Sequence, residues 1–146
     1  MRLRYVPWAL LTLMLSTACS GGTTGSSDIA RAAAVPMAVS CDDAAQLRQQ
    51  AADDRRHSEE SRSDQSRVAI GNRANFFASL AIVAELKCKV PLVETDEALT
   101  RALDAARKAE AASSFYEGAH GWAEADFAVT RVISMLIQQL GAPRLN

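Results

Sequence analysis

Apolar residues of this chain recur every three or four positions over several long stretches, which is the spacing of one face of an α-helix. Between residues 41 and 59 the repeat is thin, and Leu47 is its one large aliphatic member. From Val68 to Cys88, apolar residues cover most of the circumference, so we expect this helix at the centre of the core. Two further helices are predicted, from Thr95 to about Ser113 and from about Ala123 to Leu140.

Residues with known preferences for helix ends mark the boundaries of these segments. Ser40 is the expected N-cap of the first helix and Thr95 that of the third, and acidic residues follow both. Pro91 is expected to end the second helix. Gly141, followed by Pro143, is expected to end the last.

The third and the last predicted helices each show a clear face for burial. The face of the third consists of Leu99, Ala102, Leu103, Ala106 and Ala109. The face of the last consists of Ala125, Val129, Val132, Ile133, Leu136 and Leu140. Phe127 and Ile137 lie beside this stripe and either widen it or form an exposed apolar patch, which often marks an interaction site. On the polar side of the third helix, Asp104 and Lys108 have the spacing of an i,i+4 ion pair.

The first twenty residues carry a different pattern. Arg2 and Arg4 precede an apolar run from Val6 to Leu15, which is shorter than the roughly 20 residues that a membrane-spanning helix needs. Small residues then lead directly into Cys19. This arrangement resembles the lipobox of bacterial lipoproteins, although the leucine stands one place further from the cysteine than in the usual motif.

The resemblance implies that residues 1–18 are a signal peptide and that Cys19 becomes the first residue of the mature protein. Its thiol and its amine would carry fatty acyl chains such as palmitate, and more than one chain gives stable membrane anchoring. Ser20 stands where aspartate signals inner-membrane retention, so the same resemblance implies the periplasmic face of the outer membrane. The alternative is a plain signal peptide, or an uncleaved anchor, with an incidental cysteine.

Residues 19–39 are expected to form a flexible lipidated tether, because the stretch after Cys19 reads SGGTTGSS. Residues 40–146 then form one small helical domain. The composition is rich in alanine, which has the highest helix propensity. With a formal net charge of −1 and 5% aromatic residues, the sequence does not predict nucleic-acid binding.

If Cys19 carries lipid, Cys41 and Cys88 remain as a pair in an oxidising compartment, and we expect a disulfide between them. In one straight helix these residues would lie about 70 Å apart, at about 1.5 Å per residue. A disulfide requires Cα atoms within about 7 Å. The chain must therefore turn back near Ser61–Asp64, within the polar run 55–67. That run is interpreted as a solvated turn, and the alternative is a charged recognition surface.

The stretch 115–122, with sequence FYEGAHGW, combines aromatic residues with two glycines. Glu117 and His120 have the spacing of the Glu-x-x-His motif of di-iron bundles, but those bundles need a second copy, which this chain lacks. Gly118 and Gly121 favour a turn with aromatic side chains packed over the end of the bundle. The alternative is the lip of a binding groove, for which the candidate partner-binding residues are Phe115, Tyr116, Trp122 and Phe127.

The sequence predicts no catalytic residue, cofactor or metal site. It lacks a nucleophile elbow, a phosphate-binding loop and a zinc-protease motif, and paired acids such as Asp53 and Asp54 are interpreted as solvated surface. Two cysteines at this spacing, with only two histidines in the chain, match no common zinc site.

These observations predict an all-α, four-helix, up-and-down bundle on a lipidated tether, with its first two helices forming a disulfide-stapled hairpin. The expected function is non-catalytic: an adaptor or assembly module of the cell envelope that binds a protein partner. The general plan is similar to that of helical pilotins of secretion systems. The alternative is a periplasmic immunity or inhibitor protein that neutralises a toxin or an envelope enzyme, which would favour a concentrated acidic face.

Overall fold

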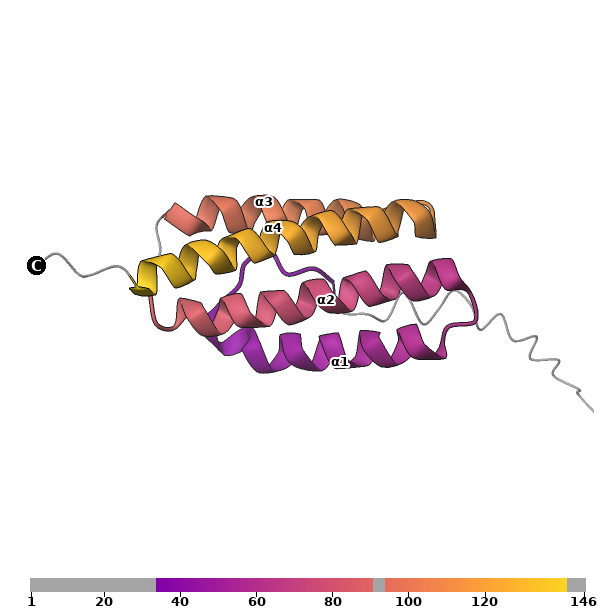
Figure 1. Ribbon diagram of the computed structural model, residues 1–146, viewed down its shortest axis with the longest axis horizontal. Coiled ribbons are helices and arrows are strands. Elements are labelled where there is room, and N and C mark those ends of the chain that lie inside the picture. The colour runs from indigo at the N-terminus through magenta and orange to yellow at the C-terminus, as the bar shows by residue number, and fades with distance from the viewer. Residues whose placement is uncertain (1–33, 91–93, 142–146) are drawn as a thin grey trace, which may run out of the picture. The chain divides into compact units, whose positions relative to one another are not determined.

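The computed structural model of the protein describes residues 34–90 and 94–141. The expected signal peptide, Cys19 and most of the expected tether lie outside the described residues, as do Pro91 and Pro143. Regular structure in the described part is entirely helical, which confirms the all-α prediction. A short 3₁₀ turn, η2 (Cys41–Asp43), leads into α1 (Ala44–Glu60), followed by α2 (Asp64–Lys87), α3 (Glu94–Glu110) and α4 (Phe115–Gly141) (Figure 1).

The helices alternate in direction along the chain, as an up-and-down bundle requires (Figure 1). In space α2 packs against α1 on one side and against α4 on the other, and α3 packs against α4. The central helices α2 and α4 run parallel. Asn72 Nδ2 donates to Ala119 O at 2.9 Å, and Ser79 Oγ donates to Asp126 Oδ1 at 2.6 Å. Both bonds join residues with the same separation in sequence, which only a parallel pair can maintain.

The predicted hairpin of the first two helices is confirmed. The chain turns between Glu60 and Asp64, and Ser63 Oγ accepts a hydrogen bond from Ser66 N–H as the N-cap of α2. At the open end, Cys41 and Cys88 form the expected disulfide, with their Cα atoms 5.2 Å apart.

Segment 34–40 belongs to the packed body. Val35 and Val39 are buried in the same core as the four helices. Side chains from α3 and α2 hold the backbone of the segment: Glu110 accepts from Val35 N–H at 3.4 Å, Arg107 donates to the oxygen of residue 36 at 3.2 Å, and Lys87 Nζ donates to Val39 O at 3.2 Å. The body therefore begins before Ser40, and the last residues of the expected tether lie against the helices rather than free in solvent.

The core is centred on α2, as its apolar pattern predicts. The largest fully buried apolar side chains come from α2, α3 and α4: Phe76, Phe77, Leu80, Val83, Leu103, Val129, Val132 and Leu136. The expected buried face of α3 is confirmed in full, whereas Leu140 of the expected α4 face is exposed. No described helix is long and apolar enough to cross a membrane.

The prediction of a turn at 115–122 is wrong, because α4 begins at Phe115 and runs through both glycines. Ser114 Oγ accepts from Glu117 N–H at 3.2 Å and satisfies one of the free amides of the first turn. A Cβ on Gly121 would stand 2.8 Å from the Cβ of Ala109. This glycine therefore permits close packing of α4 on α3 and does not interrupt the helix.

Two details of α3 also differ from expectation. The helix begins at Glu94 and ends at Glu110, so Thr95 lies inside its first turn and is not the N-cap. Asp104 forms its ion pair with Arg107, one residue closer than the expected Lys108.

Candidate functional site

The solvent-facing side of α4 carries a continuous stripe of residues without fixed charge. We call it the outward stripe, and its members recur at three- and four-residue intervals. They are Tyr116, His120, Ala123, Phe127, Thr130, Ser134, Ile137 and Gly141. Each of these residues is exposed. A helix face of this composition is unusual on a solvated surface, where charged residues dominate.

The large members of the outward stripe project far into solvent. Tyr116 is 74% exposed, Phe127 68% and Ile137 56%. The hydroxyl groups between them bond to their own helix, since Thr130 Oγ1 donates to Asp126 O at 3.0 Å and Ser134 Oγ donates to Thr130 O at 3.1 Å. With their protons used in this way, these side chains can pack against an apolar surface without leaving a donor unsatisfied.

Helices α1 and α3 do not offer such a face. The exposed side of α3 carries charges at almost every turn: Asp96, Glu97, Arg101, Asp104, Lys108 and Glu110. The exposed side of α1 is likewise polar and charged over most of its length. The outward stripe of α4 therefore has no counterpart on α1 or α3, whereas α2 also exposes Val68 and Ile82.

The four predicted partner-binding residues separate into two groups. Tyr116 and Phe127 lie on the outward stripe, and Phe115 is exposed at the start of α4. Trp122, by contrast, is only 5% exposed, so it does not fit the alternative in which it lines the lip of a binding groove. Its ring lies 5.4 Å from that of Phe76, centroid to centroid, so this tryptophan serves the core.

A buried ionic cluster joins α1 to α2, and a carboxylate of α3 lies at its edge. Asp54 of α1 is 2% exposed, and its Oδ1 accepts from Arg73 Nη1 of α2 at 3.2 Å. Arg73 Nη2 also lies 3.9 Å from Glu110 Oε1 of α3. The guanidinium packs against aromatic rings as well, 5.6 Å from the centroid of the Trp122 ring.

This cluster corrects the interpretation of Asp54 as solvated surface. Leu47, Ala51, Asp54 and Ser58 form the buried side of α1, at helical spacing. The sequence could have indicated the burial of Asp54, because this residue continues the helical spacing that begins with Leu47. A charged residue in an apolar stripe points to a buried partner on a neighbouring helix.

Burial raises the pKa of the Asp54 carboxyl, and the positive charge of Arg73 opposes the rise. Gln50 Nε2 also donates to Asp54 Oδ1 at 2.9 Å, whereas Oδ2 is buried with no hydrogen-bond partner among the described residues. Because Asp54 and Arg73 are both largely buried, their ion pair links α1 to α2 inside the packed body.

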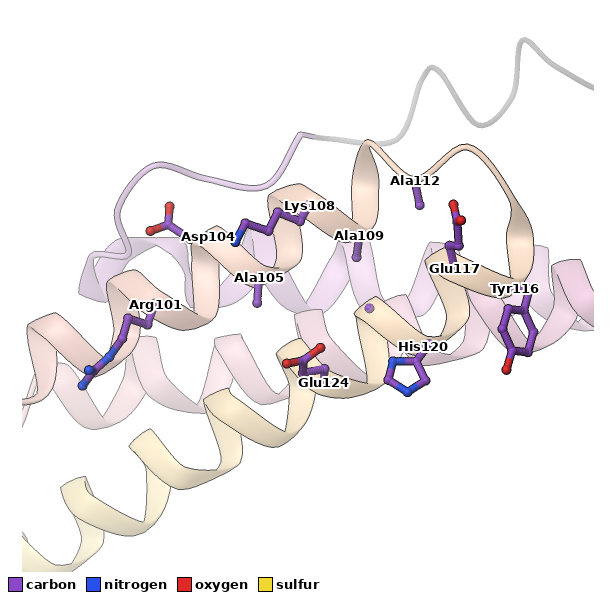
Figure 2. Close-up of a pocket in the computed structure, with 11 residues that line it drawn as sticks. Arg101, Asp104, Ala105, Lys108, Ala109, Ala112, Tyr116, Glu117, His120 and Glu124 are labelled. Atoms are coloured by element: carbon purple, nitrogen blue, oxygen red, sulfur yellow. The ribbon is translucent and has the colours of Figure 1, made fainter.

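A shallow groove follows the line where α3 and α4 meet (Figure 2). Small residues, among them Ala105, Ala109 and Gly121, line part of it. Its polar lining mixes the two signs of charge: Arg101, Asp104, Lys108, Glu117, His120 and Glu124. This mixture is not the concentrated acidic face that an inhibitor protein would favour.

Glu117 and His120 both line this groove, yet they do not form a metal site. Glu117 Oε2 accepts from Ser113 Oγ at 2.9 Å, and Figure 2 shows its carboxylate and the His120 ring pointing in opposite directions. No group of three metal-ligating side chains gathers anywhere in residues 34–90 and 94–141.

Comparisons of the chain with protein-family models, with curated proteins and with solved structures give no match. The functional argument therefore depends on the residues and on their geometry.

Proposed function

We propose that this chain is a lipid-anchored lipoprotein of the bacterial cell envelope that acts as a non-catalytic adaptor or assembly module. It contacts a protein partner through the outward stripe of α4. The observation that supports this proposal most directly is the exposure of Tyr116, Phe127 and Ile137 on one charge-free helix face. Aromatic residues are enriched at protein interfaces, and tyrosine is among the residues that most often contribute large binding energies there.

The anchor in this proposal is the acylated Cys19, and the destination is the periplasmic face of the outer membrane. Its support is the order of charged, apolar and small residues before that cysteine. We expect cells that express the chain to incorporate labelled palmitate into it, and Cys19→Ala to abolish the label and the membrane attachment. Normal membrane attachment of the unlabelled Cys19→Ala chain would refute the lipid anchor.

The docking role can be tested in intact cells with a photoreactive amino acid placed on α4. Full-length chains carrying the probe at Phe127 or Ile137 are expected to give a discrete cross-linked protein band. A matched control carries the probe at Glu59, which is exposed on α1. Anchored, folded protein that gives no protein cross-link from either α4 position would contradict the docking role.

A further inference from the structure

We infer that the outward stripe of α4 binds the same stripe of a second copy of this chain, with the two α4 helices antiparallel. This inference rests on the proposed docking role of the stripe and names the partner. A surface that pairs with itself about a two-fold axis must be complementary to its own reversed sequence. The outward stripe meets that condition in side-chain size and in charge.

Size complementarity appears when the two-fold axis lies between Phe127 and Thr130. Phe127 of one copy then faces Thr130 of the second copy, and one register follows for the whole stripe. The two aromatic side chains each face a smaller residue, since Phe127 falls opposite Thr130 and Tyr116 falls opposite Gly141 of the second copy. A Cβ on Gly141 would meet no described residue within 4 Å, so this part of the chain leaves room there for the tyrosine ring.

The remaining positions of the stripe fit the same register. Ala123 faces Ser134 of the second copy, and His120 faces Ile137 of the second copy. The Ser134 hydroxyl bonds to its own helix, so the close pair Ala123–Ser134 buries no unsatisfied donor. Small residues at these central positions allow the two helices to approach closely.

Charge complementarity follows from the same axis. Glu124 and Arg131 lie on the same flank of the outward stripe, two turns apart. In an antiparallel two-fold pair, the same flank of the stripe lies side by side in the two copies. Glu124 of each copy therefore faces Arg131 of the other, which gives two ion pairs per dimer. Neither side chain forms an ion pair with any other described residue.

The neighbouring helix α2 contributes to the same interface. The bond between Ser79 and Asp126 sets the register of α2 beside α4, and it places Ile82 level with the two-fold axis. Ile82 is 44% exposed. It meets Ile82 of the second copy beside the axis, which widens the contact beyond a single pair of helices.

The lipid anchor favours such a pairing. Two copies held in one membrane have a raised effective concentration, so a modest interface suffices for association. A two-fold axis normal to the membrane allows both anchors to lie in the same leaflet. The inference therefore concerns the full lipidated chain in its envelope.

The register is tested by cysteine cross-linking in intact cells. Two differently tagged full-length chains are co-expressed, one with Ala123→Cys and one with Ser134→Cys, and mild oxidation is expected to yield a disulfide between the two tags. Each variant expressed alone is expected to give no dimer. In the antiparallel pair, residue 123 of one copy lies about 16 Å from residue 123 of the second copy along the helix axis, at about 1.5 Å per residue. A disulfide cannot span that distance.

The charge pairs supply an independent test that preserves the fold. Glu124→Arg or Arg131→Glu alone places like charges opposite each other and is expected to weaken dimer formation about tenfold in detergent solution. The double variant Glu124→Arg with Arg131→Glu restores both pairs and is expected to recover dimerisation. Three variants with equal dimer strength would contradict the assigned register.

The outcomes separate this inference from the proposed function. A disulfide from Ala123→Cys alone would indicate a parallel pair and overturn the antiparallel arrangement. If no dimer forms with any variant while the probe at Phe127 cross-links a different protein, the docking role stands and self-association is refuted. If neither a dimer nor any other cross-link forms, both proposals fail.

Discussion

Asp54 shows how one side chain connects the sequence pattern to the stability of the bundle. It occupies a position on α1 that apolar residues occupy one and two turns earlier, and the fold removes it from water. An isolated buried carboxylate is strongly unfavourable, and the Arg73 guanidinium compensates for much of that cost. Because the charged pair joins α1 to α2, a substitution there affects the packing of two helices.

Stability should depend on pH through Asp54. Since burial raises its pKa, the folded chain binds this proton more readily than the unfolded chain. The resulting stabilisation is complete below the ordinary aspartate pKa of 3.8 and is lost as the pH rises through the raised folded value. Asp54→Asn mimics the neutral carboxyl at every pH, so the difference in unfolding free energy between the variant and the wild type should shift toward the variant as the pH rises.

Urea denaturation of both proteins at several pH values between about 4 and 7 measures this difference. Glu59→Gln, on the exposed side of α1, is the control and should follow the wild type. Wild type and Asp54→Asn with parallel pH profiles would show that the carboxyl is not perturbed.

At the scale of the elements, the contact between α3 and α4 depends on the absence of one side chain. A Cβ at Gly121 would stand 2.8 Å from Ala109 Cβ, whereas a Cβ at Gly118 would find ordinary contacts of 3.8 Å or more. We expect Gly121→Ala to destabilise the protein by about 1–3 kcal/mol, because the helices must separate. Gly118→Ala should be neutral or stabilise it by up to about 1 kcal/mol through helix propensity. Thermal denaturation of the two variants makes this comparison, and equal effects would argue against a close approach at Gly121.

The hairpin of α1 and α2 depends on its disulfide, because α1 buries few large side chains. Cys88→Ser should lower the free energy of unfolding by about 2–4 kcal/mol, mainly by releasing the unfolded chain. Cys41→Ser should have the same effect, and the double variant should lose no more than either single variant. Additive losses in denaturant titrations would mean that each cysteine contributes through packing instead.

At the scale of the whole packed body, segment 34–40 acts as an additional element beside the four helices. Val39 is buried in the core, whereas Met37 is 79% exposed. Val39→Ala should destabilise the body by about 1–3 kcal/mol, because it removes buried methyl groups. Met37→Ala should change stability by less than about 0.5 kcal/mol. If calorimetry finds the two variants equally stable, the segment does not contribute to folding in solution.

Most features that depend on local sequence or on cysteine spacing were predicted correctly, whereas several features that depend on tertiary contacts were not. The helices, the hairpin and the buried face of α3 follow from local periodicity and from the cysteine spacing, and the structure confirms them. The stretch 115–122 was predicted wrongly because glycine disfavours a helix locally, and only the neighbouring Ala109 shows why Gly121 lies in one. The exposure of Phe127 and Ile137 was one of two outcomes that the sequence left open, and it is the one observed.

The sequence by itself determined the helical class, the order of the helices and the disulfide, because each depends on residues near one another or on covalent chemistry. The tertiary structure decided which helices touch. It placed α2 and α4 in parallel at the centre, buried Trp122, paired Asp54 with Arg73 and left the outward stripe uncovered by any described segment. Such contacts join positions far apart in the chain, and their free energies depend on packing geometry that no local pattern encodes.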